Sequence, residues 1–224
     1  MKLHSFIYEI LIFSLILLFC IVPPFFAAFT EEQVVFAQVT FPWKSLCLFL
    51  FALVFYYLIL QKRFTVSFYT LLTFIFCLSL LFFNFLVIKA ASILLADKIN
   101  ANPLYSGASV VVPQNAVQWI FNVFNFLFAS FYEEVIYRVY FPEQLVALLK
   151  RINKNRIFQI AAEIVAELIA LAVFSFAHLY LGFLSVINAA LAHIVLRFFY
   201  RLRKDFISCW AAHFIYNIIS LILL

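Results

Sequence analysis

Long apolar runs, separated by short polar connections, fill most of this chain. Each run is about as long as an α-helix must be to cross the hydrocarbon core of a bilayer. The runs lie at about residues 6–29, 42–60, 65–95, 114–141, 157–179, 182–200 and 206–224. The pattern therefore predicts an all-α fold, a polytopic transmembrane helical bundle of about seven spans.

The composition strengthens this prediction. Of the 224 residues, 68% are hydrophobic and 11% are charged, which is not the balance of a soluble globular protein. No polar stretch is long enough for a separate soluble domain, so we expect one transmembrane domain over residues 1–224. With only two glycines, alanines must allow close helix packing, for example Ala161, Ala162, Ala166, Ala189, Ala190 and Ala192. The four cysteines lack paired spacing, so we expect no disulfides and no metal knuckle.

The basic residues fall on alternate connections. Lys and Arg gather at residues 62–63, 150–156 and 201–204, and Lys2 precedes the first run. The other connections carry Glu31 and Glu32, the balanced pair Asp97 and Lys98, or no charge near residue 181. The positive-inside rule then predicts a cytoplasmic N-terminus and an external C-terminus. The net charge of +5 is explained by these clusters, and we expect no nucleic-acid partner.

Prolines mark two expected irregularities. Pro23 and Pro24 should kink or break the first span. Pro142 is expected to end the helix of residues 114–141. The following stretch, 143–156, alternates Leu and Val with charges, which predicts an amphipathic helix at the membrane interface.

Two adjacent glutamates, Glu133 and Glu134, lie within an otherwise apolar run. A charge at the bilayer centre costs about 2.5–3.5 kcal/mol, so such residues usually mark a functional site. Glu134 and Arg138 are spaced i,i+4 in the favoured order for an ion pair. This pairing leaves Glu133 without a local partner, as a candidate general base or acid. The alternative is that all three charges form a structural clasp between helices.

Two later segments carry polar residues on apolar helices. His178 lies at the end of the fifth run, where a lone histidine is more often an interfacial or satisfied residue than a catalyst. His213 and Asn217 are spaced i,i+4 in the last run and line one helix face; an interhelical hydrogen bond is the alternative. His193 is a further intramembrane histidine that we expect to lie outside the site. Interfacial or packing roles are expected for Glu9, Asn84, Lys89, Glu163 and Glu167.

Together, these side chains suit the activation of water. A glutamate and a histidine can hold and deprotonate a water, while a second histidine and an asparagine donate to a developing oxyanion. Glu133, His178 and His213 could instead bind zinc with an open position. The chain lacks the His-Glu-x-x-His spacing of the common zinc peptidases.

The order of these motifs resembles a known family. Glu133-Glu134…Arg138, Phe174…His178 and His213…Asn217 resemble the CAAX protease and bacteriocin-processing family (CPBP, Abi) of intramembrane endopeptidases, including type II CAAX prenyl proteases. The likeness covers about residues 115–224. It implies a cavity in a helical bundle where Glu133 and His178 activate water and His213 and Asn217 stabilise the oxyanion. Glu134 and Arg138 would hold the site in shape. The chain departs from the family at Val139, where glycine is usual, and in a longer basic stretch at 146–158.

We therefore expect an intramembrane endopeptidase of a bacterial cytoplasmic membrane, with a membrane-associated peptide or protein as substrate. No cofactor is expected, and zinc is the alternative. The competing hypotheses are a non-proteolytic immunity or regulatory protein on the same scaffold, or a small proton-coupled transporter. This topology does not place the candidate site residues at one depth. It puts His178 near the outer end of its span, but Glu133 and His213 in the inner half. Either the fifth helix starts near Ala162 or the helices are strongly tilted.

Overall fold

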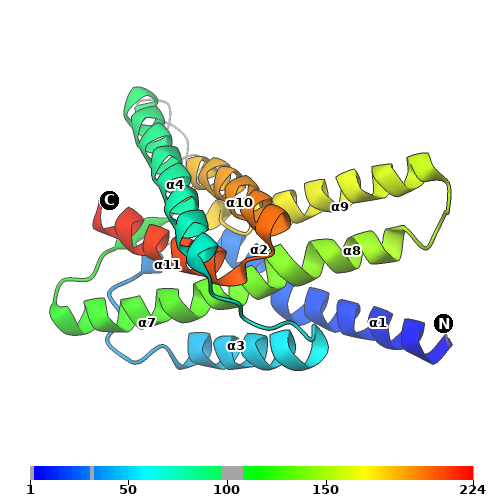
Figure 1. The fold of residues 1–224 in the computed structure, drawn as a ribbon. Helices are drawn as coiled ribbons and strands as arrows, with labels where there is room; N and C mark the ends of the chain where they lie inside the picture. The colour runs from blue at the N-terminus through cyan, green and yellow to red at the C-terminus, as the bar shows by residue number, and fades with distance from the viewer. Residues whose placement is uncertain (1–2, 31–32, 97–107, 224) are drawn as a thin grey trace.

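The computed structural model describes residues 3–30, 33–96 and 108–223. This part of the chain is helical apart from two three-residue strands (Figure 1). Its elements are α1 (Leu3–Ile16), the π-helical turn η1 (Leu17–Ile21), α2 (Val22–Thr30), β1 (Gln33–Val35), α3 (Trp43–Val54), π-helical η2 (Phe55–Ile59), α4 (Phe68–Leu94), β2 (Ser109–Val111), α7 (Ala116–Glu133), π-helical η3 (Glu134–Tyr140), α8 (Phe141–Leu149), α9 (Arg156–Phe176), the 3₁₀ turn η4 (Leu179–Leu181), α10 (Phe183–Arg203) and α11 (Phe206–Ile222). The strands pair in parallel, with Val34 opposite Val110. They are a local addition to the expected all-helical fold.

Four helices of the described chain are long and apolar enough to cross a membrane. They are Phe6–Phe26, α4, α9 and α10, while Trp43–Ile59 and α11 are shorter apolar helices. These six correspond to six of the seven apolar runs. The remaining run, residues 114–141, forms α7, which continues through η3 into α8 (Figure 1). The all-α fold with four helices long and apolar enough to span a membrane is confirmed, and seven complete spans remain a prediction.

Neither proline site ends its helix, which corrects the expectation for Pro142. The helix of the Glu-Glu motif runs from Ala116 to Leu149, and Pro142 lies in the first turn of α8. The first span is likewise continuous from Leu3 to Thr30. A π-helical segment precedes the prolines in both cases, η1 before Pro23 and η3 before Pro142. Such segments shift the backbone hydrogen bonds by one residue, and this shift accommodates a residue that cannot donate.

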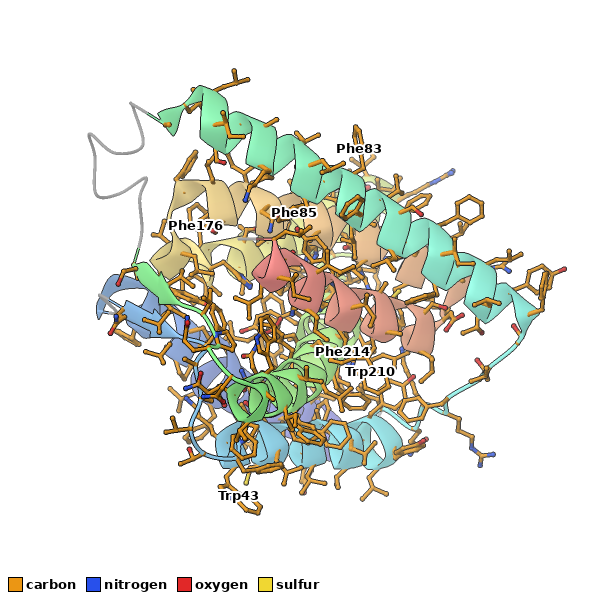
Figure 2. The ribbon with its side chains drawn as sticks, turned by 90° about the vertical axis from the view of Figure 1, so that its left-hand side faces the viewer. Trp43, Phe83, Phe85, Phe176, Trp210 and Phe214 are labelled. Carbon is orange, nitrogen blue, oxygen red and sulfur yellow. The ribbon has the colours of Figure 1, made fainter. Side chains whose placement is uncertain are left out.

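The apolar side chains divide between lipid and core. Figure 2 shows Phe83 of α4 and Trp43 of α3 pointing away from the bundle, and both are exposed. By contrast, the η3 side chains are all buried, so the segment that follows Glu133 lies at the centre of the packing. Alanines allow the close approach of α9 and α10, as expected; those that are buried are Ala162, Ala166, Ala170, Ala189 and Ala192. Ala161 is exposed, so the packing role predicted for it was wrong. Ala190 is half-buried, so its prediction was only partly right.

The basic connections meet at one end of the bundle, as the alternating pattern predicted. Lys62 after α3 and Lys204 after α10 both form ion pairs with Glu143 of α8. At the same end, Arg151 pairs with Glu9 of α1, and Lys150 pairs with Glu163 of α9. The opposite end carries the β1–β2 pair, where the Ala108 amide donates to the Tyr180 carbonyl at 2.7 Å. Lys2, Glu31, Glu32, Asp97 and Lys98, which also entered the orientation argument, lie outside the described residues.

The depth difference between the motif histidines has a structural explanation. α9 begins at Arg156 and not near Ala162, so the first alternative was wrong. The start of α11 lies inside the bundle, where Asp205 and Phe206 are buried. Asp205 accepts from the Ser208 amide at 3.1 Å, and the Ser208 hydroxyl donates to the Thr70 carbonyl of α4 at 2.8 Å. His213 lies two turns further along α11, and its ring and that of His178 both pack near Phe174.

Candidate active site

His213 brings the first and third motifs together. Its Nδ1 atom lies 2.8 Å from Glu134 Oε1, and its Nε2 atom lies 3.6 Å from Glu133 Oε2. A carboxylate can only accept, so Nδ1–H donates to Glu134. Within the described residues, Glu133 has no ion-pair partner on its own helix, as expected, but α11 supplies a distant one. One imidazole contacts both adjacent carboxylates.

The two glutamates differ in accessibility, because adjacent residues of a helix point about 100° apart. The Glu134 side chain is 1% exposed, whereas that of Glu133 is 25% exposed. Glu133 is the last residue of α7, and Glu134 begins η3. The change of helical type thus falls between the two carboxylates. Glu133 is accessible to an incoming molecule, and Glu134 belongs to the core.

Arg138 is fully buried and has three partners. Its Nε atom lies 3.6 Å from Glu134 Oε1, which confirms the predicted i,i+4 ion pair. Its Nη1 atom lies 2.7 Å from His193 Nδ1. A guanidinium only donates, so this His193 nitrogen is the acceptor. The guanidinium carbon also lies 3.8 Å from the centre of the Phe174 ring, within cation–π range. His193, expected outside the site, belongs to its supporting shell.

His178 is held by the last turn of α9. Its Nδ1 atom lies 2.9 Å from the Phe174 carbonyl oxygen, which can only accept, so Nδ1 carries the proton. Burial lowers the pKa of His178, and the negative charge of Glu133 acts in the opposite direction. The neutral ring then presents Nε2 as a hydrogen-bond acceptor. His178 is suited to hold a water rather than to carry a charge.

The Phe174 ring connects the second motif with the other two. The rings of His178, His193 and His213 lie 4.8, 5.5 and 6.5 Å from it, centre to centre. Tyr137 of η3 packs against the same ring at 5.5 Å. The phenylalanine of the Phe-x-x-x-His motif therefore fills the space between α9, α10, α11 and η3. Its packing fixes how far apart the histidines lie.

Asn217 lies one turn beyond His213 on α11 and is half-buried. Its side chain makes no hydrogen bond with the described part of the chain. The preceding residue, Tyr216, faces another cluster, in which its hydroxyl donates to Asn188 Oδ1 at 2.6 Å and Asn84 Nδ2 donates to the same oxygen at 2.7 Å. The structure thus places Glu133, Glu134, Arg138 and His213 in direct contact and connects His178 through Phe174. Asn217 lies on the same helix as His213 but forms no hydrogen bond with these residues.

A further set of charges supports the motif helix from the side. Arg197 of α10 binds Glu167 of α9 through Nε at 3.0 Å and Nη2 at 2.7 Å, and its Nη1 atom donates to the Arg138 carbonyl oxygen. Sequence reasoning gave Glu167 an interfacial or packing role and overlooked Arg197. The available signal was the i,i+4 spacing of His193 and Arg197 on one apolar helix, opposite a glutamate well inside a span.

The residues do not fit a zinc site as they are arranged. Zinc needs three protein ligands at about 2.0–2.3 Å. The Nδ1 atoms of His213 and His178 are hydrogen-bonded, as is usual for metal-binding histidines, and each Nε2 atom is free of hydrogen bonds with the described residues, so the spacing of the side chains decides. Within the described ranges, no three His, Cys, Asp or Glu side chains are grouped so that they could hold a metal ion.

Comparison with known proteins agrees with the resemblance seen in the motifs. Residues 115–219 match the family model described as type II CAAX prenyl endopeptidase, Rce1-like. Comparisons with curated proteins and with solved structures gave no match. The matched segment begins at the N-cap of α7 and ends within α11, so it includes all three motifs. Residues 115–219 therefore form a domain of the Rce1-like type II CAAX prenyl endopeptidase family, the CAAX protease and bacteriocin-processing family.

Proposed function

We propose that this chain is an intramembrane endopeptidase that hydrolyses a peptide bond of a membrane-associated peptide or protein. The observation that carries the proposal is the contact of His213 with both Glu133 and Glu134. It joins residues 79 or more positions apart in an apolar bundle. A charged cluster of this kind is costly to bury. A structural clasp would require only the Glu134–Arg138 pair and would not leave Glu133 partly accessible.

Glu133 and His178 are the residues that we assign to the water. Glu133 is the accessible carboxylate, and its helix-mate Glu134 already neutralises Arg138. A water between Glu133 and His178 would donate one proton towards the carboxylate and the other towards His178 Nε2. Glu133 then takes a proton as the water oxygen attacks the scissile carbonyl, and returns it to the leaving amine. The products are a carboxylic acid and an amine.

His213 and Asn217 are assigned to the carbonyl oxygen of the substrate. The Asn217 amide can donate without any change of charge. The Nδ1–H group of His213 donates to Glu134, so Nε2 can donate to an oxyanion only when the ring carries both protons. Two such donors are worth several kcal/mol in the transition state, because removing one typically costs about 10²–10³ in kcat. Glu134, Arg138 and Phe174 position these groups and do not touch the substrate.

The test compares the peptide termini that the protein generates in membranes. The wild-type chain and Glu133→Gln are expressed at equal levels, and new N- and C-termini are identified by mass spectrometry of membrane and secreted proteins. We expect termini that appear with the wild-type chain and disappear with Glu133→Gln. Glu163→Gln, at a glutamate that is 43% exposed and pairs with Lys150, is the matched control and should cleave like the wild type. Equal cleavage by Glu133→Gln would overturn the assignment of the base.

A further inference from the structure

A pocket opens between the first half of α9 and the end of α10. Its volume is about 330 Å³, and it is lined by Ile160, Glu163, Ile164, Glu167, Leu168 and Arg201. This volume is typical of pockets that bind small ligands, which measure about 300–1,000 Å³. None of the lining residues belongs to the three motifs, so the proposed hydrolysis does not use this pocket.

One wall of the pocket is an apolar stripe of α9. Ile160, Ile164 and Leu168 are spaced four residues apart and therefore share one helix face. They are 53, 56 and 58% exposed, on a helix that is long and apolar enough to cross a membrane. The stripe starts one turn after Arg156, the first residue of α9, at the end of the bundle where the basic connections meet. The pocket thus lies at the level where acyl chains meet lipid headgroups.

The polar wall of the pocket contains one cation that is poorly matched. Both oxygens of Glu167 accept from Arg197, at 2.7 and 3.0 Å, and Glu163 pairs with Lys150. Arg201 is 51% exposed and reaches these two carboxylates only at 3.4 and 4.0 Å. A guanidinium has five N–H donors. Arg201 can therefore bind a further anion without breaking the shorter ion pairs.

The charges near the pocket favour such an anion. Lys154, in the loop before α9, and Arg156 are exposed, and neither forms an ion pair with the described residues. Basic pockets between membrane helices are common binding sites of anionic lipid headgroups. Arginine is well suited to phosphate, because its fork of N–H groups can bind two oxygens at once. A phosphodiester that carries acyl chains complements both the polar and the apolar wall.

We propose that this pocket binds an anionic phospholipid of the surrounding membrane, with its phosphate on Arg201 and an acyl chain along Ile160, Ile164 and Leu168. The lipid site lies outside the motif cluster, and the proposal does not depend on the peptidase assignment. The bound lipid covers the ion pair between Glu167 and Arg197, which joins α9 to α10. Lipid binding therefore stabilises the folded bundle.

The test is the thermal stability of the purified protein in a neutral detergent with added dioleoyl phosphatidylglycerol, measured as the monodisperse fraction after heating. A ligand that binds only the folded state stabilises it by RT ln(1 + [L]/Kd). At about ten times Kd, this should raise the melting temperature of a chain of this size by about 3–6 °C. Arg201→Gln should abolish the rise and still fold, because both carboxylates keep their shorter ion pairs. Ile164→Trp fills the pocket without changing a charge and should also abolish the rise.

Arg203→Gln is the matched control. It removes the same charge two residues further along α10, where the guanidinium lies 4.8 Å from the centre of the Tyr69 ring of α4, and it should keep the full rise. Zwitterionic dioleoyl phosphatidylcholine should give a smaller rise with the wild-type protein. An equal rise with this lipid, or in both pocket variants, would overturn the proposal. An equal rise with glycerol 3-phosphate, which has no acyl chains, would indicate a site for soluble phosphate esters and would also overturn it.

Discussion

Replacing Glu134 by glutamine gives the sharpest test of how the site is held together. Glutamine keeps the shape of the side chain and an oxygen that can accept from His213 Nδ1. It removes the negative charge that lies 3.6 Å from Arg138 Nε, in a pair of which both side chains are 1% exposed. The substitution therefore leaves a buried guanidinium without its counter-charge.

The expected loss of stability in Glu134→Gln depends on the partners that Arg138 keeps. Breaking a buried ion pair by removing one member typically costs about 3–5 kcal/mol. Arg138 keeps the His193 acceptor and the face of Phe174, so we expect the lower end, about 3 kcal/mol. For a chain of this size, 1 kcal/mol shifts the melting temperature by about 2–4 °C. Glu134→Gln should then melt roughly 6–12 °C below the wild-type protein.

The assay is thermal unfolding of purified protein in detergent, followed by tryptophan fluorescence and by the monodisperse fraction on gel filtration. Glu133→Gln is the matched control, because it neutralises the adjacent carboxylate, which is more accessible and pairs with His213. It should melt within about 4 °C of the wild type, since partly exposed pairs contribute at most about 1 kcal/mol. A melting temperature of Glu134→Gln equal to that of Glu133→Gln would refute the reasoning.

Three other predictions can be checked independently. Asn217→Ala should lower kcat by about 10²–10³ while leaving the melting temperature nearly unchanged, because its side chain makes no hydrogen bond with the described residues; loss of fold with loss of activity would contradict the oxyanion role. Elemental analysis of active, chelator-washed protein should find no stoichiometric zinc; one tightly held zinc per chain, needed for activity, would overturn the metal-free mechanism but not the peptidase assignment. A single cysteine introduced at Lys154 in a cysteine-free chain should react with impermeant reagents only from the cytoplasmic side; labelling only from outside would reverse the topology.

The sequence alone determined the class of the protein and the identity of its motif residues. Apolar runs of membrane length allow few structures other than helices, because every backbone group in lipid must be paired within its own segment. The i,i+4 relation of Glu134 and Arg138 is likewise local, so the spacing was enough to predict that pair. The prediction that the basic loops lie on one side of the bundle followed from the positions of Lys and Arg alone.

Tertiary structure decided the partners of the polar residues. Glu133 looked unpaired because its partner, His213, lies 80 residues away in the chain, and no periodicity relates the two helices. His193 looked isolated for the same reason, since its partner is a side chain of η3. Pro142 was expected to end its helix, and local rules gave no sign that the helix continues through the π-helical η3 into α8. The hydrogen bond from Arg197 to the Arg138 carbonyl joins α10 to η3, so it exists only in the packed bundle.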